Sequence, residues 1–159
     1  MRLTQVFSMI EKVAPDGDPL EHHLMFAFAF HESNFEAAIT RYEPGWKYFY
    51  KTKDFAEVLL TTEDTEKVHQ ATSWGLMQIM GTVARELGYE GHLPALIDPL
   101  LNLNYGVKKI RLLRKKYSDI NDIISAYNSG NPIKNNGIYI NQKYVDSVYR
   151  RLSNITSVV

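Results

Sequence analysis

Apolar residues recur at helical spacing over most of the chain. A first amphipathic helix is predicted by i, i+3, i+4, i+7 spacing of Leu3, Val6, Phe7, Ile10 and Val13. Asp18 and Pro19 are typical of a helix start, with an aspartate cap and a proline in the first turn. The next predicted helix, residues 19–35, is apolar on several sides, so we expect it to lie buried at the centre of the fold.

The strongest helical pattern follows Asp98. Its apolar face consists of Leu100, Leu103, Val107, Ile110, Leu113 and Tyr117. The basic residues fall mostly elsewhere: Lys108, Lys109, Arg111, Arg114, Lys115 and Lys116. We interpret them as a solvated face, with contact to an acidic polymer as the alternative. Asp119 is predicted to cap a further helix that stops at Gly130. A last helix is marked by Val145, Val148 and Leu152.

Residues 41–73 carry the weakest pattern. Residues 54–73 are weakly helical, with Thr62 as a candidate cap, and Pro44-Gly45 predicts a turn. The segment from Trp46 to Tyr50 is the place where strand pairing is suggested. Residues 128–137 are predicted to form a loop. We therefore predict a mainly α, single domain over residues 1–159, with an inserted lobe or a small irregular or β element at 41–73.

Composition supports one soluble-type globular domain. The 159 residues are 45% hydrophobic and 23% charged, which argues against disorder. Lys plus Arg and Asp plus Glu each number 18, so no strong overall field recruits nucleic acid or an anionic membrane. No segment approaches the roughly 20 apolar residues that span a bilayer. The start of the chain lacks the pattern of a signal peptide, so we expect that something else delivers the protein if it works outside the cytoplasm, or that a leader has been removed.

The residues needed for thiol catalysis, for zinc binding and for nucleotide binding are missing from the sequence. Cysteine is absent, which excludes thiol catalysis and cysteine-ligated zinc. His31 and Glu32 invite comparison with the H-E-x-x-H zinc motif, but the second histidine position is Phe35. The other histidines have no ligand spacing; they are His22, His23, His69 and His92. There is no phosphate-binding or dinucleotide glycine pattern. We therefore expect no metal and no cofactor.

Glu32 is the candidate for catalysis. It follows the seven consecutive apolar residues 24–30, and Phe28 lies one turn before it on the same stripe. An ionised carboxylate beside an apolar wall is costly unless it is paired or its raised pKa is used. The alternative is a carboxylate at a helix end that simply reaches solvent.

Two further stretches change that balance. In residues 73–81, Gln78 lies within an apolar run with glycine near both ends, and residues 125–130 read Ser-Ala-Tyr-Asn-Ser-Gly. Each alone is compatible with a purely structural turn or helix end. In chain order the matching pieces are Glu32-Ser33, Gly75 to Met80, Asp98-Pro99 with Asn102 and Gly106, Ala126 to Gly130, and Tyr144-Val145.

That order resembles the catalytic domain of the soluble lytic transglycosylases, relatives of goose-type lysozyme, over residues 19–152. The resemblance implies a lysozyme-like α fold that cleaves the β-1,4 bond between N-acetylmuramic acid (MurNAc) and N-acetylglucosamine (GlcNAc) and forms 1,6-anhydro-MurNAc. Glu32 would be the single acid and base, because no second carboxylate stands in a matching motif. Glu36 lies one turn further on, and the other acids that we weighed are interpreted as caps or surface residues: Asp98, Asp119 and Asp122.

The resemblance also implies roles for substrate-binding residues. Gln78 would hydrogen-bond the sugar, and Met80 would line the wall beside the scissile bond. Tyr127 would hydrogen-bond near Glu32 or the acetamido group, and Asn128 would hold the sugar or the loop. Two further candidates are Tyr144 at the rim and Ser33, which we expect to orient Glu32 or the helix end. The aromatic residues Trp46, Tyr48, Phe49 and Tyr50 would build a satellite core or a lobe over the cleft, where aromatic faces stack on sugars.

The chain departs from the family pattern in places. The stretch from Glu32 to Gly75 is longer than usual, Gly81 follows Met80 where proline is usual, and Ile140 occupies the place of an acidic residue. A hydrolysing muramidase, with a positioned water and a second carboxylate, stays open as an alternative, and so does a non-catalytic glycan-binding module. The expected partner is peptidoglycan, and we expect a monomer. It would act on the bacterial wall, in the periplasm or outside the cell, as a phage-delivered or virion-associated lysin.

Overall fold

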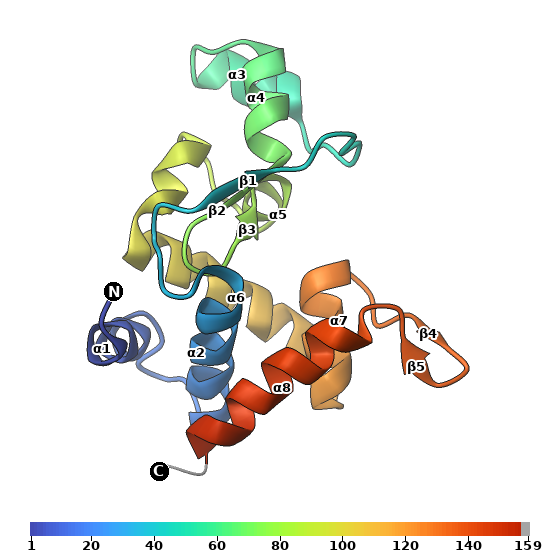
Figure 1. The fold of residues 1–159 in the computed structure, drawn as a ribbon. Coiled ribbons are helices and arrows are strands. Elements are labelled where there is room, and N and C mark those ends of the chain that lie inside the picture. The colour runs from blue at the N-terminus through green and yellow to red at the C-terminus, as the bar shows by residue number, and fades with distance from the viewer. Residues whose placement is uncertain (157–159) are drawn as a thin grey trace.

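The computed structural model describes residues 1–156, which form helices around a small sheet (Figure 1). The helices are α1 (Leu3–Val13), α2 (Pro19–Ser33), α3 (Thr52–Val58), α4 (Glu63–Gln70), α5 (Gly81–Glu86), the 3-10 helix η1 (Leu93–Ile97), α6 (Pro99–Lys116), α7 (Ile120–Ser129) and α8 (Gln142–Thr156). The strands are β1 (Thr40–Tyr42), β2 (Thr72–Trp74), β3 (Ile79–Met80), β4 (Lys134–Asn135) and β5 (Ile138–Tyr139). The predicted mainly α, lysozyme-like fold is confirmed.

The predicted starts of α2, α4, α6 and α7 are confirmed, and a short polar side chain caps each of these four helices. These caps are Asp18, Thr62, Asp98 and Asp119. The Asp18 carboxylate, for example, accepts a hydrogen bond from the backbone N–H of Glu21 at 2.8 Å. α2 ends before the predicted residue 35, because Asn34 adopts a left-handed conformation with φ of 51°. Glu32 therefore lies in the last turn of α2.

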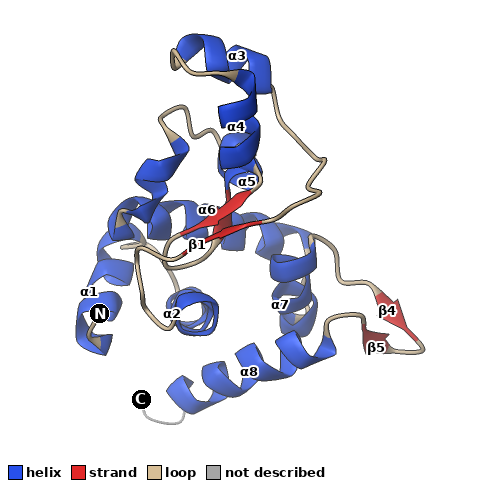
Figure 2. Ribbon diagram, turned by 45° about the horizontal axis from the view of Figure 1, so that its top comes forward, coloured by secondary structure: helices blue, strands red, loops and turns tan. Residues whose placement is uncertain are grey.

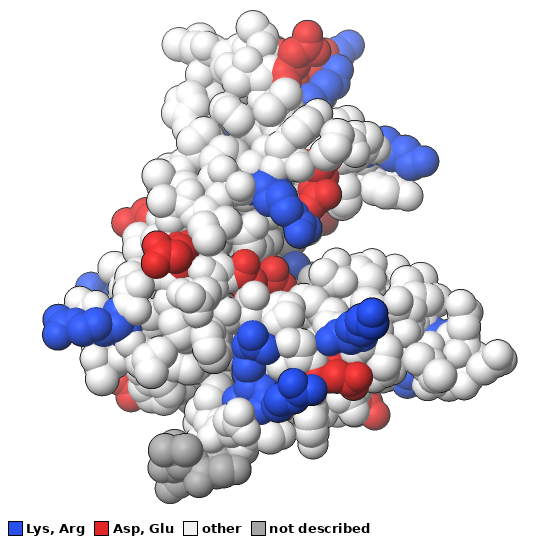
Figure 3. All heavy atoms as spheres, viewed as in Figure 1, with Lys and Arg blue, Asp and Glu red and all other residues white. Residues whose placement is uncertain are grey.

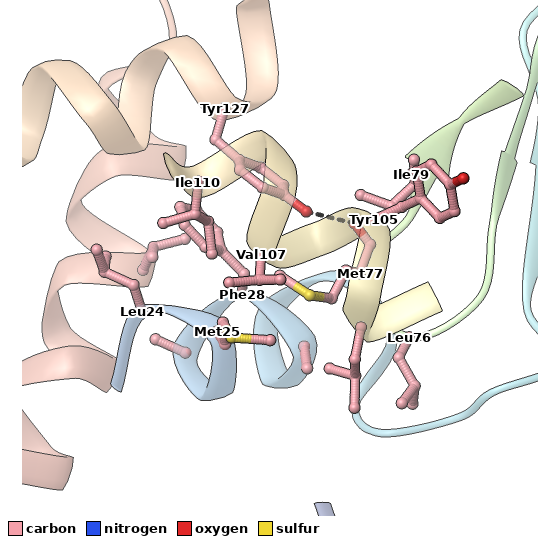
Figure 4. Close-up of a cluster of buried hydrophobic side chains, with 14 of the residues drawn as sticks. Leu24, Met25, Phe28, Leu76, Met77, Ile79, Tyr105, Val107, Ile110 and Tyr127 are labelled. Atoms are coloured by element: carbon pink, nitrogen blue, oxygen red, sulfur yellow. Dashed lines mark hydrogen bonds between the residues drawn. The ribbon is translucent and has the colours of Figure 1, made fainter. Parts of the chain in front are cut away.

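The central position predicted for α2 is confirmed. Figure 2 shows α2 nearly end-on, surrounded by α1, α6, α7, α8 and the sheet. Its fully buried side chains are Leu24, Met25, Ala27, Phe28 and Ala29. In Figure 4, Leu24, Met25 and Phe28 lie in one cluster with Met77 and with Val107 and Ile110 of α6. Burying each large apolar side chain stabilises the fold by about 1.5–3 kcal/mol, so the helix that carries Glu32 is firmly held.

The strands β1, β2 and β3 form an antiparallel sheet in that order. Arg41 lies opposite Ser73, and Ser73 lies opposite Met80, so these three residues form one row across the sheet. The sheet and helices α3, α4 and α5 make up the upper part of the molecule in Figure 1.

The strand suggested at residues 46–50 is wrong; the strand of this region is β1. The side chain of Gln70 satisfies the backbone of Tyr50 instead. The Tyr50 N–H donates to Gln70 Oε1 at 2.8 Å, and Gln70 Nε2 donates to the Tyr50 carbonyl oxygen at 2.7 Å. A buried amide thus takes the place of a neighbouring strand.

The basic residues of α6 do not form one solvated face, so that interpretation is corrected. Arg111 contacts Glu21 at 2.8 Å, and Arg114 contacts Asp18 at 2.6 Å. Glu21 is buried, so these contacts tie α6 to the start of α2. Lys109, on the same helix, lies over the ring of Tyr127 of α7.

The segment 128–137, predicted as a loop, begins with the end of α7 and contains β4 and the turn that joins β4 to β5 in a hairpin. Asn136 and Gly137 form its two-residue turn, both with positive φ, which matches the turn geometry that such hairpins prefer. Asp122 of α7 accepts a hydrogen bond from Tyr139 at 2.5 Å and pairs with Lys134 at 2.9 Å. The hairpin is therefore anchored to α7.

Candidate active site

A cleft of about 370 Å³ opens between the sheet and the end of α7. In Figure 3 the surface is hollowed between the upper part of the molecule and the lower part that contains α7 and α8, and acidic and basic side chains gather at the hollow. The row of Arg41, Ser73 and Met80 lines one wall, and residues 126–130 line another. The volume is in the range of ligand-binding pockets, so this cleft is the candidate site.

Glu32 lies between these walls, at the end of α2. Its side chain is partly buried, and Phe28 and Ala29, one turn earlier, are fully buried. Its Oε1 accepts a hydrogen bond from the hydroxyl of Tyr144 at 2.5 Å. The carboxyl is thus held in one orientation between an apolar helix and the open cleft.

Burial raises the pKa of the Glu32 carboxyl above its usual value, and this is the largest effect on it. The hydrogen bond from Tyr144 and the positive charges of Lys109 and Arg41 act in the opposite direction. Glu32 therefore keeps its proton to a higher pH than an exposed glutamate does. A general acid for a glycosidic oxygen needs this property.

Tyr144 was predicted at the rim of the cleft, and the structure places its hydroxyl on Glu32 itself. The ring of His31 contacts Tyr144 edge to face, with centroids 4.7 Å apart. Burial, followed by the negative charge of Glu32, raises the pKa of Tyr144 well above its usual value. Its hydroxyl thus stays protonated and acts as a donor to Glu32.

Asn102 of α6 holds the turn that carries Gln78. It is fully buried, and its Oδ1 accepts a hydrogen bond from the backbone N–H of Met77 at 2.8 Å. Its Nδ2 donates to the carbonyl oxygens of Trp74 and Leu96 at 2.7 and 2.9 Å. Gly75 has a φ of 69°, and a Cβ there would collide with the Asn102 side chain. These contacts give a physical reason for the asparagine and the glycine in the motif.

Replacing Asn102 by Ala is expected to lower the free energy of unfolding by about 2–4 kcal/mol, because three buried backbone groups lose their partner. Urea unfolding measures this change. Asn104→Ala is the matched control, since Asn104 is exposed on the same helix. Equal unfolding midpoints for the two variants would contradict the role given to Asn102.

Gln78 and Met80, both predicted to bind substrate, line the cleft. Gln78 has a φ of 45°, a strained conformation for a residue with a Cβ. Its Nε2 donates to the carbonyl oxygens of Ile39 at 3.0 Å and Gly75 at 2.9 Å. Both amide hydrogens are engaged within the protein, so Oε1 is the atom that Gln78 offers to a ligand.

Tyr127 and Asn128 contribute to the wall formed by the end of α7. The Tyr127 ring stacks on Phe28, with centroids 3.8 Å apart and planes 15° apart. Its hydroxyl donates to the carbonyl oxygen of Met77 at 2.8 Å (Figure 4), so it supports the turn and does not bond Glu32. Asn128 is exposed, and Asn141 donates to its Oδ1 at 3.1 Å, which orients its amide.

Ser33, the substrate-binding candidate beside Glu32, does not line the cleft. It is buried, and its hydroxyl lies 2.8 Å from the carbonyl oxygen of Leu76 and 3.0 Å from that of Ala29. It therefore joins the end of α2 to the turn before Gln78 and acts on the position of Glu32.

Trp46 is the member of the aromatic segment that lines the cleft. Its indole N–H is shared between the carbonyl oxygen of Tyr48 at 2.8 Å and the hydroxyl of Thr82 at 3.1 Å. Tyr48 is 67% exposed, so these residues do not form a closed satellite core. The anchored indole presents an aromatic surface to the cleft.

Sequence reasoning missed Lys109, Arg41 and Glu43, which all line the cleft. Lys109 carried a signal, because it follows Asn102 and Gly106 at helical spacing on one face of α6. Arg41 and Glu43, which pair at 2.5 Å, carried none, because they belong to the segment with the weakest pattern.

Two features are absent from residues 1–156. No group of three or more His, Asp or Glu side chains there is arranged to hold a metal ion. None of the helices in this range combines the length and the apolar character needed to span a bilayer.

Comparison with known proteins adds independent evidence. The family model described as the transglycosylase SLT domain matches residues 10–149. No curated protein and no solved structure gives a match to the chain. The matched range includes Glu32, the turn with Gln78, the end of α7 and Tyr144, and so it contains every wall of the cleft. The chain therefore belongs to the transglycosylase SLT domain family.

Proposed function

We propose that this protein cleaves the β-1,4 bond between MurNAc and GlcNAc and leaves a 1,6-anhydro-MurNAc end. Family membership supports a peptidoglycan-acting function of the lytic transglycosylase type. The specific reaction is inferred from the state of Glu32. Its carboxyl lies in the cleft, burial raises its pKa, and a hydrogen bond from Tyr144 orients it.

Glu32 acts first as an acid and then as a base. Its proton passes to the glycosidic oxygen while the bond from MurNAc C1 to that oxygen breaks and the 2-acetamido oxygen of the substrate attacks C1. The Glu32 carboxylate then takes the proton of the C6 hydroxyl while that oxygen displaces the acetamido oxygen at C1. Glu32 ends protonated, and the substrate supplies both nucleophiles, so the reaction consumes no water.

The other cleft residues hold the glycan. Oε1 of Gln78 accepts a hydrogen bond from a sugar hydroxyl or amide, and Asn128 contacts the sugar from the end of α7. Met80 lines the wall beside the scissile bond, and the indole of Trp46 stacks on a sugar ring. We expect a monomer that acts on the bacterial wall. Phage delivery stays a prediction.

Mass spectrometry of muropeptides released from purified peptidoglycan tests the proposal. We expect products with 1,6-anhydro-MurNAc ends. Reducing MurNAc ends would move the assignment to a muramidase. Binding to peptidoglycan without release would leave a glycan-binding module and overturn the enzymatic function.

A hydrolysing muramidase is the second candidate, because a second carboxylate does line the cleft. Glu36, the acid considered from the sequence, is exposed and outside the lining, whereas Glu43 lies in it beside Arg41. A hydrolase needs such a group to activate water. If the protein is a transglycosylase, Glu43→Gln retains anhydro products at a rate within about threefold of wild type. If it is a hydrolase, this variant loses the reducing ends.

A further inference from the structure

The ammonium of Lys109 makes a cation–π contact with the ring of Tyr127. Its Nζ lies 3.8 Å from the ring centroid. Phe28 stacks on the same ring, also at 3.8 Å between centroids. One face cannot hold both groups at this distance, so Phe28 and Lys109 occupy opposite faces. A cation on an aromatic face is attracted by the negative electrostatic potential that the quadrupole of the neutral ring creates there, which holds the ammonium beside the cleft.

The side-chain ammonium of Lys109 makes no hydrogen bond and no ion pair to any of the described residues, 1–156. Its side chain is partly buried and lines the cleft together with Glu32. Burial lowers the pKa of Lys109 to about 8, and the negative charge of Glu32 opposes this lowering. Lys109 is therefore still mainly charged at neutral pH, and its charge acts on Glu32.

We propose that Lys109 is a positioning residue for the reaction: its ammonium, seated on Tyr127, stabilises the carboxylate form of Glu32 between the two proton transfers. This inference rests on the proposed function, in which one residue both gives and takes the proton.

A single acid and base works under two opposed demands. It must hold a proton at the start and exist as a carboxylate in the middle of each cycle, so its pKa has to lie near the working pH. Burial alone pushes the pKa of Glu32 upward. The hydrogen bond from Tyr144 and the charge of Lys109 act downward and keep both forms accessible.

Arg41 is the other cation that acts on Glu32, and it is less able to do so. Its side chain is 71% exposed and pairs with Glu43 at 2.5 Å. Solvent, salt and its own partner weaken its field at Glu32. Glu43 also lines the cleft, where its carboxylate is paired with Arg41. Lys109 is the cation in the cleft lining that has no acidic partner among the described residues.

The other titratable groups around Glu32 are neutral at pH 7. Burial raises the pKa of both Tyr127 and Tyr144 well above the usual value, so both keep their protons. Burial, followed by the charge of Arg151, lowers the pKa of His31, which packs on Tyr144. None of these groups replaces the positive charge of Lys109.

A titration of the free protein tests the inference without any substrate. The carboxyl resonance of Glu32, assigned by its loss in Glu32→Gln, is followed by NMR in carboxyl-labelled protein. We expect the neutral variants Lys109→Met and Lys109→Gln to raise the pKa of Glu32, and Lys109→Arg to leave it close to wild type. Lys108→Met is the matched control, because Lys108 lies 4.3 Å from the ring centroid of Tyr105 and outside the cleft lining.

The pH dependence of muropeptide release is the second readout. Lys109→Met should shift the alkaline limb of kcat to higher pH and lower the plateau by roughly 3- to 10-fold, because a weaker acid protonates the leaving oxygen more slowly. Lys109→Arg should restore both features. If wild type releases nothing, the proposed function fails, while the titration still decides the role of Lys109. An unchanged pKa of Glu32 in both neutral variants would overturn the inference.

Discussion

Glu32→Gln is expected to reduce the release of muropeptides by about 10³-fold or more, because the variant can neither protonate the glycosidic oxygen nor take the C6 proton. Glutamine has nearly the shape of glutamate, so the hydrogen bond from Tyr144 and the walls of the cleft are preserved. Binding to peptidoglycan should therefore persist. Mass spectrometry of the released products and a pull-down with insoluble peptidoglycan measure the two quantities separately.

Glu36→Gln is the matched control for this variant. Glu36 lies four residues further on, is exposed and does not line the cleft, so its replacement should leave release close to wild type. Substantial release of muropeptides by Glu32→Gln would show that another group supplies the proton and would contradict the proposed mechanism.

Glu32→Gln is also expected to unfold at a higher urea concentration than wild type at pH 7. Burial raises the pKa of Glu32 in the folded state above its value in the unfolded chain. The folded protein therefore disfavours the carboxylate, and wild type loses stability as the pH rises from the unfolded pKa through the folded one. The neutral glutamine avoids this loss. The difference should disappear below the ordinary pKa of a glutamate, and a difference that persists there would contradict this origin.

Breaking the buried ion pair of Arg85 and Glu66 is expected to lower the free energy of unfolding by about 3–5 kcal/mol, since either single replacement leaves a buried charge without its partner. Both side chains are about 1% exposed or less, and Nε of Arg85 donates to Glu66 Oε1 at 2.8 Å. A second bond joins Nη2 to Oε2 at 3.1 Å, which makes the pair bidentate. Arg85→Met and Glu66→Gln, followed by urea unfolding, measure the loss.

This pair connects the upper part of the molecule to the cleft. Glu66 also accepts a hydrogen bond from Gln70, which in turn binds the backbone of Tyr50 at the end of the aromatic segment. Trp46, in the same segment, lines the cleft. We therefore expect the single variants to weaken glycan binding as well as stability.

Lys67→Met is the control for the ion pair. Lys67 and Glu63 form a partly exposed i, i+4 pair at 3.0 Å, so the loss there should stay within about 0.5 kcal/mol. The double variant Arg85→Met with Glu66→Leu should recover much of the stability, because no unpaired charge is left. A loss in the single variants no larger than that of Lys67→Met would show that water already reaches the pair.

Local features explain what could be predicted from the sequence alone. Helix periodicity and capping depend on residues within a few positions of one another. The helices α1, α2 and α6 and their starts can therefore be predicted from the sequence. The order of short motifs identified the family and placed Glu32, Gln78, Met80, Tyr127 and Asn128, which all line one cleft.

Contacts between distant segments required the tertiary structure. Tyr144 reaches Glu32 across 112 positions, and the row of Arg41, Ser73 and Met80 depends on strand register in a segment without periodicity. The position of Lys109 on Tyr127 depends on how α6 and α7 pack. The helical domain, its family and the candidate acid can be predicted from the residues alone. The charges that surround this acid can be identified only in the folded protein, because burial and electrostatic interaction depend on distances in space and not on separation along the chain.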